Sequence, residues 1–155
     1  MNGIIWNVRG LDASGPRIFQ LIKYWRVNFV IVIEPMVDFY KAGFFKLELG
    51  LSNVLFSPLN KIWIFWDSNV IAISEVTWES QYTHFKVTNG SFEGWITAIY
   101  AKHTHVERRL LWDHLKHYST SIIVPWMMGG YFNAIVDHSK HKGACIPNLI
   151  SMMEF

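Results

Sequence analysis

The chain has 155 residues, of which 51% are hydrophobic, 17% charged and 16% aromatic, a profile that excludes a disordered or fibrous protein. Fourteen Lys and Arg against twelve Asp and Glu leave a net charge of +2, too small for bulk charge alone to indicate a polyanionic partner. No apolar run approaches the ~20 residues that cross a bilayer, so we expect one folded domain and no membrane span.

Cysteine content and the N-terminal sequence bear on the compartment. Cys145 is the single cysteine, which excludes an internal disulfide framework and a Cys-rich zinc site. The first residues lack the basic start, long apolar centre and small-residue cleavage site of a signal peptide. We therefore expect an intracellular protein, whose metal ligands, if it has any, are oxygen or imidazole groups.

The beginning of the chain predicts a strand, a helix and a second strand. Residues 2–8 are β-branched and aromatic, as in a short strand. Ser14 as N-cap and Pro16 in the first turn begin an amphipathic helix, whose apolar residues recur at helical spacing up to Trp25. Residues 28–33 form an apolar run too brief for a helix, which predicts a strand covered on both faces.

The middle of the chain predicts β structure. Residues 39–58 carry mixed signals and predict a loop with room for one short strand. Residues 61–66 and 70–78 are strand-like and separated by a polar turn, which predicts a hairpin. A further strand follows, and Asn89-Gly90 is a strong hairpin signal before residues 95–100 resume the β pattern. We expect a meander of antiparallel strands.

The last third predicts a second helix and a further strand. Thr104 and Glu107 form a capping box, and the apolar spacing that follows carries the helix to about Ser119. Residues 122–128 predict a strand that Pro125 restricts to an edge or a bulge and that the following Gly129-Gly130 ends. Beyond it, the sequence predicts a polar loop over residues 137–148 and the start of a helix over residues 150–155. These elements form one α/β unit of mixed sheets.

Polar residues follow three of the predicted strands. Asn7 ends the first strand, Glu34 follows residues 28–33, and Asn133 follows the glycine pair. Neighbouring strands of an α/β fold deliver their terminal residues to a common edge, where ligands bind. The alternative is that each residue merely caps its strand, and position in the sequence does not decide between the two.

Four segments, in their sequences and in their order along the chain, resemble those of the endonuclease/exonuclease/phosphatase superfamily. The resemblance is specifically to the endonuclease-like domain of plant non-LTR (LINE-type) retrotransposon proteins. The segments are residues 4–11 (IIWNVRGL), 32–35 (VIEP), 97–101 (TAIYA) leading through 108–115 (RRLLWDHL), and 125–135 (PWMMGGYFNAI). This resemblance implies a four-layer α/β sandwich of the DNase I-like type, with residues 1–155 as its N-terminal portion, incomplete at the C-terminal end.

The resemblance also implies a metal-dependent phosphodiesterase. Glu34 would hold Mg²⁺ or Mn²⁺ with help from Asn7, and no small-molecule cofactor is implied. Tyr100 matches a tyrosine whose hydroxyl approaches the phosphate, and Asn133 matches an asparagine that positions water and phosphate. Ordinary packing is the alternative reading of these residues, and an unrelated α/β interaction module is the alternative reading of the whole chain.

Two departures from the family pattern bear on activity. The family has Gly-Asp-Phe-Asn where this chain has Tyr131 after Gly130, and a phenol, which stays protonated at neutral pH, cannot replace a carboxylate as a general base. The family's later catalytic residues lie beyond the end of this chain. We therefore expect impaired catalysis, with an inactive fragment that retains metal or nucleic-acid binding as the alternative.

Four basic residues are candidates for weak DNA contact: Arg9, Lys102, Arg108 and Arg109. Solvated surface charges are the alternative. We assign no role to His138 or His141, and the spacing of the other histidines does not indicate zinc. A retroelement origin would imply a nuclear location.

The missing part of the fold would also leave strands uncovered. We expect residues 61–66 and 122–128 to form exposed sheet edges through which the protein self-associates.

Overall fold

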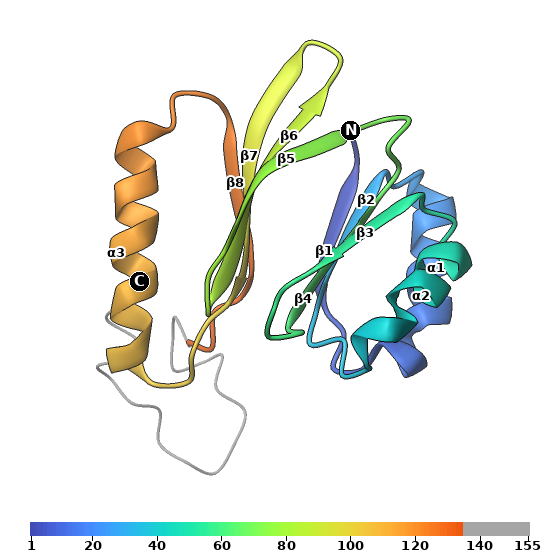
Figure 1. The fold of residues 1–155 in the computed structure, drawn as a ribbon, viewed down its shortest axis with the longest axis horizontal. Coiled ribbons are helices and arrows are strands. Elements are labelled where there is room, and N and C mark those ends of the chain that lie inside the picture. The colour runs from blue at the N-terminus through green and yellow to red at the C-terminus, as the bar shows by residue number, and fades with distance from the viewer. Residues whose placement is uncertain (135–155) are drawn as a thin grey trace.

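The computed structural model describes residues 1–134, which form four layers, with helices outside and two sheets inside (Figure 1). The predicted four-layer sandwich is therefore confirmed. In chain order the elements are β1 (Gly3–Asn7), α1 (Leu11–Trp25), β2 (Phe29–Ile33), η1 (Phe39–Lys41), α2 (Ala42–Glu48), β3 (Asn53–Phe56), β4 (Ile62–Trp66), β5 (Ala72–Trp78), β6 (Tyr82–Asn89), β7 (Phe92–Tyr100), α3 (His105–Ser121) and β8 (Trp126–Tyr131).

The first sheet has the strand order β1-β2-β4-β3. β1 is parallel to β2, with Asn7 opposite Ile33, and the other pairs are antiparallel. Every residue of β2 and of β4 is buried, because α1 and α2 cover one face of this sheet and the second sheet covers the other. The prediction of a strand covered on both faces is confirmed for β2.

Alternate residues of these strands build two cores. Val30 and Phe65 pack with the helices, in one hydrophobic cluster. Ile31 and Ile64 pack with residues of the second sheet, including Phe85, in another. The period of two along a strand thus divides each continuous apolar run between the two faces.

The second sheet has the strand order β5-β6-β7-β8. β5, β6 and β7 form the predicted antiparallel meander, and Gly90 takes a positive φ of 57° in the turn between β6 and β7. α3 then crosses over the sheet so that β8 pairs parallel to β7. The predicted capping box is present, since Thr104 Oγ1 accepts a hydrogen bond from the Glu107 amide at 3.3 Å.

The predicted hairpin of residues 61–66 and 70–78 is wrong. Both sides of β4 are already paired, with β2 and β3, so β5 joins the other sheet. The polar turn does form, because Asp67 Oδ1 accepts from the Asn69 amide at 3.0 Å, but it carries the chain from one sheet to the other. Since β4 is an interior strand, residues 61–66 are not an exposed edge.

The start of α1 differs from the prediction, and two helical segments were not expected. α1 begins at Leu11, and the Ser14 hydroxyl donates to the Val8 carbonyl at 3.2 Å instead of capping the helix. Pro16 consequently lies inside α1. Residues 39–48, expected as loop, form η1 and α2, while the expected short strand is β3.

The prediction that Gly129-Gly130 ends the last strand is wrong, because both glycines lie within β8. Gly130 has a φ of 150°, and a Cβ atom there would lie 2.1 Å from the Ile99 carbonyl oxygen of β7. These glycines therefore allow close strand packing. β8 is an edge of the second sheet among the described strands, as Pro125 predicted.

Residues 137–148 and 150–155, with the predictions for His138, His141 and Cys145, lie outside the described residues. Within residues 1–134, no helix combines the length and apolar character needed to cross a membrane.

Candidate functional site

The carboxyl ends of two parallel strand pairs meet at one end of the sandwich, the lower end in Figure 1. Asn7 is the last residue of β1 and Tyr100 the last residue of β7. Glu34 directly follows β2, and Asn133 lies two residues beyond β8. The structure thus brings all four predicted residues to one edge, because parallel pairing aligns the ends of the strands.

Glu34 and Tyr100 join the two sheets directly. The Tyr100 hydroxyl donates to Glu34 Oε1 at 2.7 Å, within the range of a strong hydrogen bond to a carboxylate. Burial and this hydrogen bond raise the pKa of Tyr100 to about 12, so the phenol remains protonated and donates. A half-buried carboxylate is therefore fixed at the junction of the sheets.

The environment of Glu34 keeps its carboxyl group ionised. Partial burial acts to raise its pKa, but the hydrogen bond from Tyr100, the nearby Asn7 amide and the positive charges of Arg9 and Lys61 outweigh burial. The net result is that the pKa of Glu34 lies below its ordinary value of 4.5. The group is a carboxylate at neutral pH and can act as a metal ligand.

Asn7 lies beside Glu34 with its amide group only partly used. Its Oδ1 accepts from the Arg9 backbone amide at 3.2 Å. Its Nδ2 is buried and makes no hydrogen bond within residues 1–134. The Asn7 amide nevertheless lies close enough to Glu34 to lower the pKa of that carboxyl group. A buried amide group with unused hydrogen-bonding capacity is typical of a site that completes its contacts with a ligand or water.

Three residues at this edge adopt the left-handed backbone conformation. Arg9, Glu34 and Asn133 have φ values of 47°, 54° and 50°. Such a conformation costs a non-glycine residue roughly 1–2 kcal/mol, and these outliers cluster at functional sites. They follow β1 and β2 in one sheet and β8 in the other, so three of the seven non-glycine residues with positive φ among residues 1–134 lie at this edge.

Tyr131 lies inside this site. Its ring stacks on Tyr100, with centroids 6.3 Å apart and planes at 23°. Arg9 Nη2 donates to the Tyr131 hydroxyl at 3.4 Å, and the guanidinium carbon lies 5.9 Å from the ring centroid. The phenol is thus held among site residues by Arg9 and Tyr100.

The side chains of Asn133 and Arg108 donate hydrogen bonds to backbone carbonyls of the chain. Asn133 Nδ2 donates to the Ala101 carbonyl at 2.6 Å. Arg108 is 0% exposed and donates to the carbonyls of Lys102, His103 and Asn133 at 3.1, 2.8 and 2.9 Å. A buried guanidinium cannot reach a nucleic acid, so the predicted DNA contact of Arg108 does not fit the structure.

The other predicted basic contacts, Arg9, Lys102 and Arg109, are exposed. Arg9 and Lys102 each follow the end of a strand at the site, whereas Arg109 lies on α3.

The ligands available for a metal ion are few and are oxygen donors. Within residues 1–134 there is no group of three or more His, Cys, Asp and Glu side chains that could hold an ion. Glu34 with Asn7 offers one carboxylate and one amide, which suits Mg²⁺, an ion that keeps several waters and takes one or two protein carboxylates besides substrate oxygens. This donor set does not suit zinc.

Sequence reasoning missed Lys61 and the cleft it borders. Glu34, Met36, Asn60 and Lys61 are among the residues that line a cleft of about 310 Å³ beside the site. The Lys61 ammonium lies 5.7 Å from the Tyr100 ring centroid. No local signal distinguishes this lysine, because pairing of β4 with β2 is what brings it next to Glu34.

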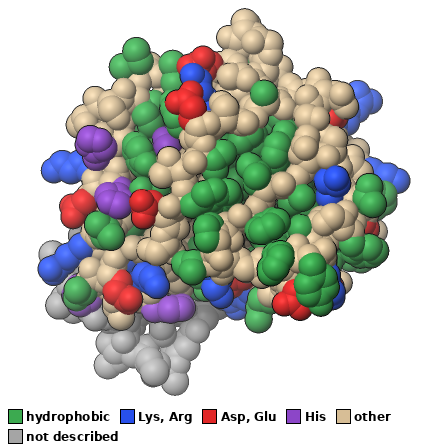
Figure 2. Space-filling model, in the orientation of Figure 1, with side chains coloured by type: hydrophobic (Ala, Val, Ile, Leu, Met, Phe, Trp, Pro, Cys, Tyr) green, Lys and Arg blue, Asp and Glu red, His purple; other side chains and the backbone are tan. Residues whose placement is uncertain are grey.

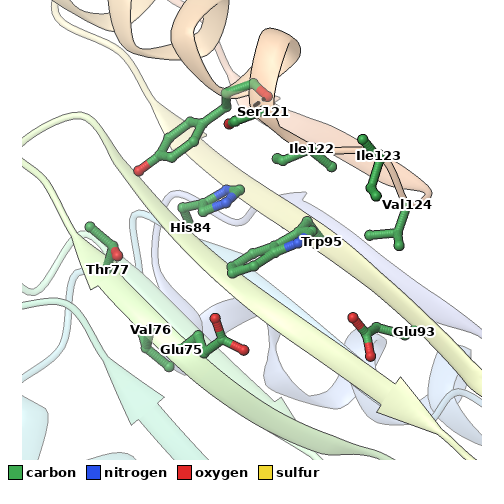
Figure 3. A pocket seen from close by; sticks show the side chains of 11 residues that line it. Glu75, Val76, Thr77, His84, Glu93, Trp95, Ser121, Ile122, Ile123 and Val124 are labelled. Carbon is green, nitrogen blue, oxygen red and sulfur yellow. Dashed lines mark hydrogen bonds between the residues drawn. The ribbon is translucent and has the colours of Figure 1, made fainter.

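A larger pocket, of about 620 Å³, lies on the outer face of the second sheet near the end of α3 (Figure 3). Glu34 is not among the residues that line it. His84 is 3% exposed there and lies between the Trp95 and Tyr118 rings, at centroid distances of 4.5 and 4.0 Å. Its Nδ1 is 2.7 Å from Thr97 Oγ1, and burial lowers the pKa of His84 to about 4. The neutral imidazole is part of an aromatic stack.

Comparisons with known proteins bear on the fold. No protein-family model matches the chain, and no curated protein matches its sequence. Solved structures do match: D. rerio TDP2 complexed with single strand DNA product is 14% identical, with a TM-score of 0.66 over 85% of this chain and 60% of that one. An endonuclease/exonuclease/phosphatase family protein from Bacteroides thetaiotaomicron is 14% identical, with a TM-score of 0.58 over 84% and 62%.

A third similar structure is ANGEL2, a 2′,3′-cyclic phosphatase, in complex with adenosine-2′,3′-vanadate. It is 12% identical, with a TM-score of 0.51 over 79% of this chain and 44% of that one. The chain thus spans less than two thirds of the length of these proteins. At such low identity the similarity concerns the fold alone, and that fold is the one shared by endonuclease/exonuclease/phosphatase proteins.

Proposed function

We propose that this chain is the N-terminal portion of a Mg²⁺-dependent phosphodiesterase of the endonuclease type, with impaired catalysis. The observation that carries the proposal is the Glu34–Tyr100 hydrogen bond at the edge where the ends of β1, β2, β7 and β8 meet. The names of two similar structures support a phosphoester substrate, since one holds a DNA product and another is a cyclic phosphatase.

In this proposal each site residue has a distinct task. Glu34, ionised at neutral pH, and Asn7 would hold Mg²⁺ or Mn²⁺, which would stabilise negative charge on the phosphate oxygens. Tyr100 orients the carboxylate and presents its hydroxyl near the phosphate. Asn133 would position the phosphate and the attacking water after turning from Ala101, while Arg9 and Lys102 contact neighbouring phosphates.

Tyr131 supports a second candidate, an inactive domain that only binds metal or nucleic acid. Its phenol is held by Arg9 and stacked on Tyr100, where the resembling family has the carboxylate that activates water. Loss of a general base lowers the rate by roughly 10²–10⁴. Binding can survive this change, because Glu34 and Asn7 lie on other strands.

Nicking of supercoiled plasmid in Mg²⁺ tests the proposal and separates the candidates. We expect slow or undetectable nicking by the natural chain and nicking by Tyr131→Asp that is at least about 10² faster. Glu34→Gln in the Tyr131→Asp background should abolish the gain. If Tyr131→Asp gains nothing although the variant is folded, the inactive binding domain is the correct description.

The biological origin is a separate part of the proposal. The resemblance to LINE-type retrotransposon proteins of plants would place the chain at the start of a retroelement protein, with DNA as partner and the nucleus as location. A reverse-transcriptase reading frame downstream of the coding sequence would support this origin, and an unrelated downstream gene would oppose it.

A further inference from the structure

We propose that the pocket on the outer face of the second sheet binds an arginine or lysine side chain presented by a polypeptide. This pocket, of about 620 Å³, is formed by β5, β6, β7 and the end of α3 (Figure 3). Its size is within the range of ligand pockets, roughly 300–1,000 Å³. Neither Glu34 nor Asn7 lines it, so the inference is independent of the proposed function.

A β-bulge in β5 turns one carboxylate toward this pocket. The register between β5 and β6 shifts between Ser74, which is paired with Lys86 on the outer face, and Thr77. Regular alternation would therefore direct Glu75 to the face between the sheets. Glu75 instead lines the outer pocket, with a φ of 49° and with Oε1 3.2 Å from Lys86 Nζ. Bulges that re-aim a side chain in this way are common beside binding sites.

The charges at the pocket favour a cation. Lys86 Nζ lies 3.2 Å from Glu75 Oε1 and 2.8 Å from Glu93 Oε1, so two carboxylates share one ammonium group and one negative charge remains. Charged side chains of both signs lie together over the upper part of the second sheet (Figure 2). Tyr118 and Ser121, at the end of α3, also line the pocket, and the last turn of α3 has no basic side chain to offset the negative end of its dipole.

His84 supplies a hydrogen-bond donor on the buried side of the pocket. Thr97 Oγ1 accepts from Trp126 Nε1 at 2.8 Å and lies 2.7 Å from His84 Nδ1. The Thr97 hydroxyl hydrogen is therefore left for Nδ1, which assigns the proton of the uncharged imidazole to Nε2. His84 is 3% exposed, and its Nε2 makes no hydrogen bond within residues 1–134. A ligand acceptor such as a peptide carbonyl would satisfy this donor.

The positions of the donor and the carboxylates fit an amino-acid residue within a polypeptide. Thr97, the strand partner of His84, lies four residues from Glu93 along β7, a distance of about 13 Å. A basic residue can contact both ends, with its backbone carbonyl at the imidazole and its charged tip at the carboxylates. The Trp95 ring lines the pocket between these ends, and Ile122 adds an apolar wall for the aliphatic stem.

NMR titration with N-acetylarginine amide, a blocked arginine, tests the inference. Blocked citrulline has nearly the same shape without the charge, so we expect its Kd to be at least about ten-fold higher. Glu93→Gln should raise the Kd of blocked arginine at least about ten-fold, because a charged partner is lost. Glu79→Gln is the matched control, because Glu79 is an exposed glutamate just after β5 that does not line the pocket.

Butylguanidinium, which has the charge but no peptide carbonyl, distinguishes a polypeptide from a free organic cation. The natural chain should bind it about three-fold or more weakly than blocked arginine, because it makes no hydrogen bond with His84 Nε2. His84→Phe keeps a ring in the stack and removes the donor. It should weaken binding of blocked arginine by the same factor and leave butylguanidinium binding unchanged, whereas a purely structural role of His84 would weaken both.

The inference is overturned if blocked arginine does not bind, if blocked citrulline binds as tightly, or if Glu93→Gln and Glu79→Gln behave alike. Equal binding of butylguanidinium and blocked arginine by the natural chain would overturn a polypeptide as the ligand and assign the pocket to a free organic cation. Thermal melts of each variant exclude a loss of folding as the cause.

Discussion

Glu34 is half-buried and adopts a left-handed backbone conformation, yet its carboxyl pKa is lowered. Burial acts against the charged form, so the hydrogen bond from Tyr100, the nearby Asn7 amide and the charges of Arg9 and Lys61 must more than compensate. Arg9 and Lys61 also compete with a metal cation for the same carboxylate. Glu34 is therefore an ionised carboxylate that a cation can bind in competition with Arg9 and Lys61.

Removing one hydrogen bond should move this balance measurably. Tyr100→Phe deletes the 2.7 Å hydrogen bond to Glu34 Oε1, so we expect the pKa of Glu34 to rise toward its ordinary value. A carboxylate NMR titration of the natural chain and the variant measures the shift. Tyr40→Phe, an exposed tyrosine on η1, is the control. An unchanged Glu34 pKa would show that the hydrogen bond does not form in solution.

His84 predicts a pH dependence of stability far from the catalytic residues. Burial lowers its pKa from 6.5 to about 4. On acidification the unfolded chain binds the proton first, so stability is lost as pH falls from 6.5 to about 4, and higher pH restores it. The loss should be on the order of 3 kcal/mol.

Urea unfolding between about pH 7 and pH 4 checks this prediction. His84→Phe should flatten the dependence in that window, while His103→Phe, at an exposed position, should leave it as in the natural chain. Equal pH dependence in all three proteins would exclude His84 as the titrating group.

At the scale of elements, strand ends explain how much of the site the sequence predicts. Asn7, Glu34 and Asn133 stand after apolar runs, so their places at strand ends follow from local patterns. Their convergence depends on β1 pairing parallel to β2 and β7 parallel to β8, which no local pattern encodes. For the same reason, the roles of Lys61 and Asn60 could not be predicted.

The errors in predicting elements have related physical causes. Residues 61–66 and 70–78 have the pattern of a hairpin, but β4 finds partners on both sides in β2 and β3, and long-range pairing overrides the local turn. α2 was missed because it has only seven residues, too few for a clear helical period. Gly129-Gly130 has the local pattern of a strand end. The close contact between Gly130 and Ile99 that requires a glycine arises only when β8 pairs with β7.

That close contact gives a prediction for β8. Gly130→Ala would place Cβ 2.1 Å from the Ile99 carbonyl oxygen at a φ of 150°, so we expect destabilisation by at least about 3 kcal/mol. Gly43→Ala is the matched control: it meets no atom within 4 Å and lies in α2, so it should stabilise by about 0.5–1 kcal/mol. Denaturant midpoints measure both, and a neutral Gly130→Ala would contradict the β7–β8 packing.

At the scale of the whole molecule, the sandwich has sheet edges among its described strands. The edge strands are β1 and β3 in the first sheet and β5 and β8 in the second. β8 exposes Met127 and Met128, each by more than two fifths of its surface. An edge with exposed apolar side chains can pair with another chain.

We therefore predict concentration-dependent self-association through β8, measured by light scattering. Met128→Lys places a charge on this edge and should reduce association at least several-fold. Leu47→Lys adds the same charge at an exposed position on α2 and should not. A monodisperse natural chain at all concentrations would contradict the prediction, as would equal effects of the two substitutions.

The proposed function depends on binding of a divalent cation by Glu34, with Asn7, at the edge where four strands end. Electron paramagnetic resonance titration of Mn²⁺ tests it directly, because bound ions lose the signal of the free ion. We predict that the natural chain and Glu48→Gln, a surface control on α2, bind Mn²⁺ alike. Glu34→Gln should bind at least about ten-fold more weakly, since it loses the one carboxylate that residues 1–134 offer at this edge. Equal affinity of Glu34→Gln and the natural chain, or no binding by either, would contradict the account.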